Sequence, residues 1–277
     1  WVWSLIYVEY MLNIYVITNY VEERRNSNQS PPFPTTQSTT VLFGKRNNVY
    51  SILDGQVCAD HDRSEGEGIG PQEYVIIKLR VLEFPGKLAP LKGRDVFLAP
   101  ATLRPETMYG QTNCFVLPNG DYGAYEMESG EVFVISHRSA KGFACQGYTK
   151  EFAVTKCLLD LSGEDLLGLP LKCPHAVYDK VYTLPLTTIS MFKGTGVVTS
   201  VPSDAPDDYV SLQMLKDKPD YAAKFGITPE MVLPFDVVPI IEIEGFGDKA
   251  AEFMCKVSEC ISFTISIITN KNNKNHH

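Results

Sequence analysis

Residues 94–117 read RDVFLAPATLRPETMYGQTNCFVL, in which two apolar stretches flank a polar bend. The stretches 94–102 and 112–117 contain the β-branched and aromatic residues that favour strands. Pro105 lacks the N–H that a strand donates to its neighbour, so we expect the chain to bend there. The segment therefore predicts two strands of a packed domain, joined by a bend that frees backbone groups from pairing.

The bend carries side chains suited to binding a ligand. Thr102 and Thr107 lie on either side of it, and their hydroxyls and the freed backbone N–H groups can point at a ligand. Arg104 adds a fixed positive charge at the same place. The alternative interpretation is a structural corner, in which the threonine hydroxyls satisfy nearby backbone groups. These residues alone leave both interpretations open.

A second segment, KGTGVVTSVPSDAPDDYV at residues 193–210, predicts a strand that leads into a helix. Gly194 and Gly196 allow a tight turn or a close approach of the backbone to another group. After the strand at 197–201, Ser203 or one of the residues just after it is a suitable helix N-cap. The segment thus places a glycine turn before the strand and a helix N-terminus after it.

Three aspartates, Asp204, Asp207 and Asp208, fall in or beside the first turn of that predicted helix. Carboxylates there complement the helix dipole, by about 0.3–1 kcal/mol each. Three carboxylates exceed what capping requires, which indicates a cationic partner. Nothing nearby supplies the other ligands of a metal ion, so an amino group is favoured over a metal. An acidic first turn without any partner is the structural alternative.

The remaining sequence between about residues 43 and 257 alternates short strand candidates with a few helix candidates, punctuated by Gly and Pro. This pattern predicts a mixed α/β or α+β domain, with a small β-barrel core and helices packed outside it. Turn residues in 118–131 favour a hairpin or meander. We expect further strands at 131–136, 180–184, 195–201 and 237–243, and helices at 137–146, 203–216, 220–225 and 248–256.

Composition limits the classes of partner. The 277 residues include 25 Lys and Arg against 33 Asp and Glu, a net charge of −8, which excludes a protein that coats nucleic acid by bulk charge. A local contact with one nucleic-acid end remains compatible with that charge. Seven cysteines with no Cys-x-x-Cys pair argue against a zinc site or a disulfide framework, and they favour a reducing cytosolic setting.

The two segments together resemble a known family. TLRPET at 102–107, with YGQTN at 109–113, resembles the threonine-rich motif in the editing domain of cytosolic leucyl-tRNA synthetases of the eukaryotic and archaeal type. KGTGVVTSVPSDAPDD at 193–208 resembles the glycine and aspartate motif of the same domain, and the match looks closest to plant cytosolic enzymes. Further stretches that agree with the family are 43–46, 54–63, 66–74, 224–235 and 239–252.

The resemblance implies a proofreading hydrolase with a β-barrel core surrounded by helices. In the family this domain hydrolyses tRNA(Leu) wrongly charged with isoleucine, methionine or norvaline. By the same resemblance, Asp208 anchors the free α-ammonium group of the substrate, and Thr102 and Thr107 belong to the catalytic pocket. The residues that the resemblance assigns to substrate binding are Arg104, Gly194, Thr195, Gly196, Val201, Asp204 and Asp207.

The family's ATP-handling HIGH and KMSKS signatures occur nowhere in the 277 residues. The resemblance therefore implies no amino-acid activation by this chain, no cofactor for editing, and no metal site, since ATP and magnesium belong to the synthetic domain. The implied partner is the 3′ end of mischarged tRNA(Leu) in the cytoplasm, without DNA or membrane. An inactive fragment, or a remnant that binds the tRNA end, is the alternative, and intact Thr102, Thr107 and Asp208 favour the enzyme.

The two ends of the chain do not match the family. Residues 1–42 begin with an aromatic and β-branched stretch without a helical or strand period and continue into a Pro/Ser/Thr-rich linker. This stretch is too interrupted for a membrane-spanning helix, so a membrane tether is the least favoured interpretation. We expect 1–42 to be a disordered extension and both ends to reflect intron translation or a faulty gene model. The expected domain limits are 43–80 for a connector, 81–256 for the editing domain and 257–277 for a tail.

Overall fold

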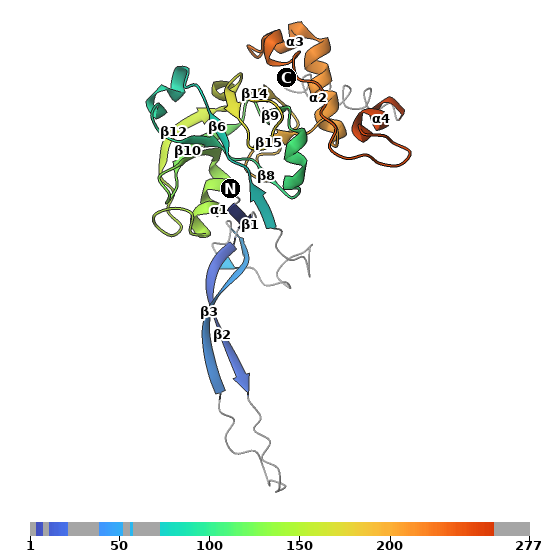
Figure 1. The fold of residues 1–277 in the computed structure, drawn as a ribbon. Helices are drawn as coiled ribbons and strands as arrows, with labels where there is room; N and C mark the ends of the chain where they lie inside the picture. The colour runs from blue at the N-terminus through green and yellow to red at the C-terminus, as the bar shows by residue number, and fades with distance from the viewer. Residues whose placement is uncertain (1–3, 8–10, 22–38, 52–55, 58–72, 258–277) are drawn as a thin grey trace, which may run out of the picture. The chain divides into compact units, whose positions relative to one another are not determined.

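The computed structural model divides the chain into two compact units, residues 1–8 with 73–277 and residues 9–72. The domain limits expected from the sequence stay predictions. Residues 66–70, part of the family-like stretch 66–74, lie outside the described residues. No helix in the described part of the chain is long and apolar enough to cross a membrane. The structure describes residues 4–7, 11–21, 39–51, 56–57 and 73–257, with side chains from 74 to 257 (Figure 1).

The unit formed by residues 9–72 contains one antiparallel ribbon. β2 (Met11–Val21) pairs along its whole length with β3 (Thr39–Ser51), from Met11 opposite Val49 to Val21 opposite Thr39. β4 (Gln56–Val57) pairs with the end of β3. β2 is therefore a strand in a stretch whose sequence shows no clean strand period.

A nine-stranded sheet forms most of the other unit. Its hydrogen bonds run in the order β12-β10-β11-β7-β6-β13-β14-β9-β15, and β11–β7 and β14–β9 are its parallel pairs. Its strands are β6 (Leu79–Val81), β7 (Val96–Leu98), β9 (Asn113–Val116), β10 (Asp121–Glu126), β11 (Val132–Ser136), β12 (Cys157–Ser162), β13 (Pro170–Lys172), β14 (Val181–Pro185) and β15 (Val197–Ser200).

A small second sheet carries the start of the threonine segment. It has the order β1-β5-β8, with β1 (Ser4–Tyr7), β5 (Glu73–Ile76) and β8 (Ala101–Thr102). We expected one strand over 94–102, but β7 and β8 belong to different sheets. The break between β7 and β8 falls at Pro100, whose carbonyl accepts a hydrogen bond from Ile77 N. The bend expected at Pro105 also forms, because the 3-10 helix η3 (Pro105–Gly110) begins there.

Alternating side chains divide the interior into a main core and two smaller cores. In β9, Cys114 and Val116 join the main core, whereas Phe115 points to the opposite face. In β11, Val134 joins the main core, whereas Ile135 points to the opposite face and joins one of the smaller cores. One face of the sheet therefore surrounds a common core while helices cover parts of the other face, as period-two alternation predicts.

The helices cover the outer face in two places. α1 packs on β11 through Phe143 and Ala140, and α2 and α3 pack on β9 and β14 through side chains such as Leu212 and Ala222 (Figure 1). The α-helices are α1 (His137–Cys145), α2 (Pro206–Asp217), α3 (Pro219–Ala223) and α4 (Ala250–Val257). The 3-10 helices are η2 (Gly86–Leu91), η3 (Pro105–Gly110), η4 (Gly163–Leu166) and η5 (Pro229–Met231).

The mixed α/β class with helices outside a β core is confirmed, with two corrections. Within the described residues no hydrogen-bond ladder joins β12 to β15, so the sheet is open where a closed barrel was expected. The strand expected at 237–243 does not form, and only Ile243 makes an isolated bridge, to Gly247. Pro239 interrupts that stretch and lacks the N–H needed for a ladder.

Candidate functional site

The two threonines of the bend bind the backbone of one residue between them. Arg104 N donates to Thr102 Oγ1 at 3.1 Å, and Thr107 Oγ1 donates to Arg104 O at 2.8 Å. Pro105 begins η3, and Thr107 is buried within it. These bonds are the local ones that a structural corner requires. They also hold both hydroxyl oxygens in fixed places.

The threonine bend and the aspartate loop meet directly. Arg104 Nη2 lies 2.7 Å from Asp204 Oδ2, although the Arg104 side chain is 62% exposed, so this ion pair contributes little stability. A Cβ added to Gly110, at the end of η3, would lie 3.1 Å from Val201 Cγ1 and 3.2 Å from Ser203 Oγ. The structure therefore brings the two predicted motifs together at Gly110 and Arg104.

The three aspartates have three different environments. α2 begins at Pro206 with Ala205 as N-cap, which is one of the residues just after Ser203, but no side chain caps the helix. Asp204 precedes the helix and pairs with Arg104. Asp207 is exposed in the first turn, where it complements the helix dipole.

Asp208 is the buried aspartate, with only 8% of its surface exposed. Its Oδ2 accepts a hydrogen bond from Val201 N at 2.8 Å. Burial raises the pKa of the Asp208 carboxyl to about 7; the nearby Asp207 and Asp204 add to the rise, while the Val201 hydrogen bond opposes it. Within residues 74–257, no ion pair neutralises this carboxyl. A cation brought to it would therefore favour its charged form.

The glycine turn lies at the other end of β15. Tyr122 Oη donates to Gly196 O at 2.6 Å, and Ser139 Oγ donates to Gly194 O at 2.6 Å. Thr195 is fully buried and its carbonyl accepts from Ser136 N at 2.9 Å. The protein itself occupies the carbonyls of the turn. A contact between this turn and a substrate stays a prediction.

Sequence reasoning missed four buried polar groups in the two motif segments. Gln111 Oε1, Asn113 Nδ2, Ser200 Oγ and Ser203 Oγ are buried and have no hydrogen-bond partner among the described residues. Buried polar atoms are usually paired, so such a group needs an explanation. The available signal was the polar run Gln111–Asn113 at the start of an apolar strand.

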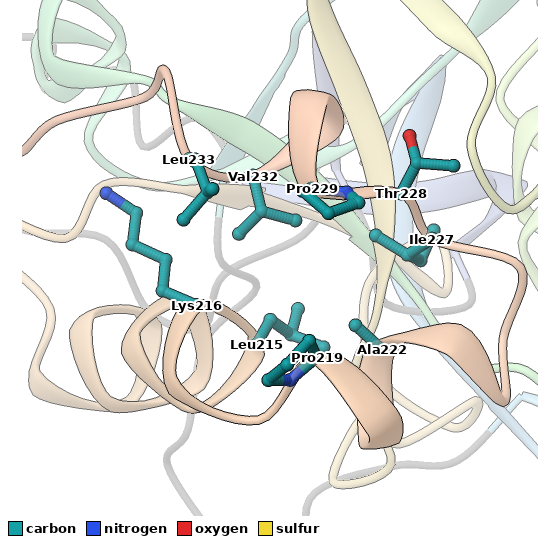
Figure 2. Close-up of a pocket in the computed structure, with 9 residues that line it drawn as sticks. All are labelled: Leu215, Lys216, Pro219, Ala222, Ile227, Thr228, Pro229, Val232 and Leu233. Carbon is teal, nitrogen blue, oxygen red and sulfur yellow. The ribbon is translucent and has the colours of Figure 1, made fainter.

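A separate cavity of about 280 Å³ lies between α2, α3 and η5 (Figure 2). Its walls are mainly apolar, and no residue of the threonine bend or of the 193–208 segment lines it. The residues around this cavity are Leu215, Lys216, Pro219, Ala222, Ile227, Thr228, Pro229, Val232 and Leu233.

No cluster of three or more His, Cys, Asp or Glu side chains is placed to hold a metal ion in the described part of the chain.

Comparison with curated proteins finds cytoplasmic leucine–tRNA ligases. The one from Arabidopsis thaliana is 56% identical over 216 residues, which cover 78% of this chain and 20% of that protein. The one from Pongo abelii is 51% identical over 216 residues, covering 78% of this chain and 18% of that protein. The chain thus spans about a fifth of the length of these relatives. No family model matches the chain.

Comparison with solved structures identifies the matching part of such enzymes. The crystal structure of GlLeuRS-CP1 is 35% identical with a TM-score of 0.65, over 72% of this chain and 86% of that chain. The editing domain of the P. knowlesi cytosolic leucyl-tRNA synthetase is 25% identical with a TM-score of 0.62, over 68% of this chain and 77% of that one. The chain belongs to the leucyl-tRNA synthetase family, as a representative of its editing domain.

Proposed function

We propose that this chain is an aminoacyl-tRNA deacylase, which hydrolyses the ester at the 3′ end of tRNA(Leu) charged with isoleucine, methionine or norvaline. The observation that carries the proposal is Asp208, a buried carboxylate without an ion-pair partner in residues 74–257, next to the threonine bend. The family and its relatives' cytoplasmic names support a cytoplasmic site of action. The proposal requires no cofactor.

A separate hydrolytic site has a physical reason. One methylene in an apolar pocket changes binding by only about 1–3 kcal/mol, so a synthetic site alone discriminates poorly among aliphatic amino acids. A second site that hydrolyses the wrong product adds a second, independent selection. In this proposal Thr107 excludes leucine, because its side chain would meet the branched γ-carbon, while isoleucine and the linear side chains avoid it.

Asp208 would anchor the substrate by its α-ammonium group. At about 4 Å and an effective dielectric near 20, the attraction between the two charges is on the order of 4 kcal/mol before desolvation. Val201 N holds one carboxylate oxygen at 2.8 Å, which leaves Oδ1 to face the ammonium. Arg104, already placed by Asp204, would supply a positive charge for the phosphate backbone of the tRNA end.

The ester is already activated, so the site must place a water molecule and stabilise the oxyanion. We assign no general base. Thr102 Oγ1 accepts the Arg104 N–H and keeps its own O–H to donate, whereas Thr107 Oγ1 donates to Arg104 O and keeps lone pairs to accept. Together with the ribose hydroxyl of the substrate, these two oxygens would orient the attacking water.

The test compares two neighbouring aspartates in the full chain. Asp208→Ala should abolish deacylation of isoleucyl-tRNA(Leu), whereas Asp207→Ala, which removes an exposed carboxylate from the same turn, should retain most of it. Circular dichroism and thermal melting establish that both variants fold. Unchanged deacylation by a folded Asp208→Ala protein would contradict the proposal and move the role to Asp204 or Asp207.

A second candidate function is binding of the tRNA end without hydrolysis. It is favoured by the hydrogen bonds that tie both threonine hydroxyls to the backbone of Arg104, because a purely structural bend would leave no side chain to place the attacking water. Binding of isoleucyl-tRNA(Leu) by the wild-type chain, with no deacylation above background, would select it. Under either candidate we expect no leucine-dependent ATP–pyrophosphate exchange, since the HIGH and KMSKS signatures do not occur in these residues.

A further inference from the structure

Two unpartnered donor groups lie at the corner where β9, β15 and α2 meet. In the part of the chain described with side chains, Asn113 Nδ2 and Ser200 Oγ are buried without a hydrogen-bond partner, and both residues have no exposed surface. Asn113 and Ser200 are directly opposite each other in the antiparallel pairing of β9 with β15. Residues opposite each other in such a pair point their side chains to the same face, with Cβ atoms about 4.5–5.5 Å apart.

That face is the one covered by α2. Phe115, two residues after Asn113 and therefore on the same face, packs in one cluster with Leu212 and Leu215 of α2. Asp208 lies four and seven residues before these leucines, so it shares their side of the helix. Asp208, Ser211, Leu212 and Leu215 are buried on one side of α2, while Val210 is buried on another side of the helix.

The contact between Asp208 and the end of β15 fixes this placement. Asp208 Oδ2 accepts from the backbone N–H of Val201, the residue that follows Ser200. The carboxylate is therefore held at the backbone of the residue that follows Ser200. Asn113 lies opposite Ser200 on the paired strand β9. Gln111 Oε1 is only an acceptor. Ser203 Oγ is a third unpartnered group of the described residues and lies beside Gly110 of η3, so Asn113 and Ser200 are the unpartnered donors on the paired strands β9 and β15.

We infer that the Asn113 amide and the Ser200 hydroxyl are positioning groups, which donate hydrogen bonds to the Asp208 carboxylate when it binds the α-ammonium group of an aminoacyl ester. The inference rests on the proposed function and adds residues to it. A buried carboxylate stays charged only where donors or cations compensate the lost hydration. Val201 N–H supplies one donor, and the substrate supplies the cation. The two unpartnered groups supply the rest, which explains why polar side chains are kept unpaired at full burial.

Ser200→Ala is the sharpest variant, because the Ser200 hydroxyl has no partner to lose. Removing an unsatisfied buried hydroxyl should leave the stability of the free protein unchanged or raise it. A residue with a purely structural role would lower stability when truncated. The expected combination is unchanged or higher melting temperature with weaker recognition of the ammonium group.

Recognition of the ammonium group is measured with two non-hydrolysable ligands on the full chain. The first is isoleucyl adenosine linked by an amide, and the second is its 3-methylpentanoyl counterpart, which lacks only the α-amino group. Their affinity ratio reports the interaction with Asp208 and cancels contacts with adenosine and the side chain. Hydrogen bonds to charged groups are strong enough that Ser200→Ala should lower this ratio by about tenfold.

Three further variants make the outcome decisive. Asn113→Leu should lower the ratio as well, with some loss of stability because Thr112 Oγ1 loses its acceptor. Thr199→Val changes the neighbouring residue of β15, which points to the other face, and should leave the ratio unchanged. In an Asp208→Ala background, Ser200→Ala should have no further effect on the ratio, because the group it positions is gone.

The results separate this inference from the function on which it rests. If the wild-type chain binds both ligands equally, the ammonium-binding role of Asp208 is wrong and the inference falls with it. If Asp208→Ala lowers the ratio but Ser200→Ala and Asn113→Leu leave it at the wild-type value, the proposed function stands and the inference is wrong. A lowered ratio in both positioning variants, absent in Thr199→Val, supports it.

Discussion

The two ends of β15 carry parts of one sequence motif but differ in how their polar groups are satisfied. At the Gly196 end, Tyr122 and Ser139 donate to the turn's carbonyls at 2.6 Å each. At the Val201 end, the carboxyl of Asp208 is buried with one backbone donor, and Ser200 Oγ has no partner within residues 74–257. Polar groups that the protein pairs internally stabilise the fold, whereas unpaired buried groups cost free energy and require an explanation, which the proposed substrate contact would supply.

The comparison also separates the two threonines from the three aspartates. Thr102 and Thr107 are bound to the Arg104 backbone, so their hydrogen bonds are compatible with a structural role alone. Asp208 has no such explanation, because burial raises its pKa to about 7 and so opposes its charge. Substitutions at the two threonines and the aspartate should therefore differ in their effects.

The largest effect should be a pH dependence of stability at the Asp208 end. Its folded-state pKa, about 7, is above its ordinary value of 3.8, so the folded state binds the proton more tightly than the unfolded state. The free energy of unfolding should therefore fall as pH rises from about 4 to about 7, by up to about 4 kcal/mol from this group.

Urea denaturation at pH 5 and pH 7.5 checks this prediction. Other groups titrate in the same range, so the relevant quantity is the difference between the wild type and Asp208→Asn, which cannot ionise. The variant should lose the downward trend that Asp208 contributes and become relatively more stable at the higher pH. Parallel pH profiles for the two proteins would mean that Asp208 titrates normally.

The second effect concerns selectivity at the threonine bend. If Thr107 blocks leucine by a steric clash, relieving an overlap of about 1–3 kcal/mol should raise the ratio of leucyl- to isoleucyl-tRNA(Leu) deacylation by roughly 5- to 150-fold in Thr107→Ala. Thr107→Val keeps the shape without the hydroxyl and should keep leucine excluded, while a bulky residue should block every substrate. A fixed ratio with a lower melting temperature would make Thr107 structural.

The third effect tests the glycine end of β15. Gly196 has φ of +79°, and a Cβ there would lie 3.0 Å from Met191 Cε, so Gly196→Ala should lower the free energy of unfolding by about 1–2 kcal/mol. Gly194→Ala, with φ of +61° and no neighbour within 4 Å, is the matched control and should cost less. Weaker binding of both adenosine ligands by a fully stable Gly194→Ala or Gly196→Ala protein would instead assign this turn to the substrate.

The smallest effect should come from the ion pair that joins the two motifs. Because Arg104 is 62% exposed, Arg104→Ala should lower stability by only about 0.2–1 kcal/mol, and less at high salt. Arg80→Ala, which breaks a similarly exposed pair with Asp95, is the control. A loss of several kcal/mol for Arg104→Ala alone would show that the pair holds the two motifs in place.

Sequence patterns predicted those elements whose side chains alternate regularly. β9, β11, β14 and β15 were expected close to their observed bounds because apolar residues recur on both faces. The stretch at 237–243 has the same composition, yet its apolar side chains such as Ile241 remain exposed and no ladder forms. Composition does not reveal whether a partner strand is available, and pairing depends on tertiary structure.

The candidate site was predicted by residue but not by environment. Leu212 and Leu215 give α2 an apolar side, and Asp208 is buried on that side although a carboxyl is ordinarily exposed. The unpaired state of Ser200 and Asn113 also depends on strand register and helix placement, neither of which the local sequence specifies. Motif matching therefore located the aspartate, and only the structure separated it from its acidic neighbours.

In the proposed function, the buried carboxyl of Asp208 loses its proton and becomes charged when the substrate's ammonium group binds beside it. The most direct test is a ¹³C NMR titration of aspartate side-chain carboxyls, with the Asp208 signal assigned by its loss in Asp208→Asn. The free protein should show a pKa of about 7 for Asp208. Saturation with amide-linked isoleucyl adenosine should bring this pKa well below 7, whereas the 3-methylpentanoyl counterpart should not. A pKa near 4 in the free protein, or one that the amine-bearing ligand leaves unchanged, would contradict the account.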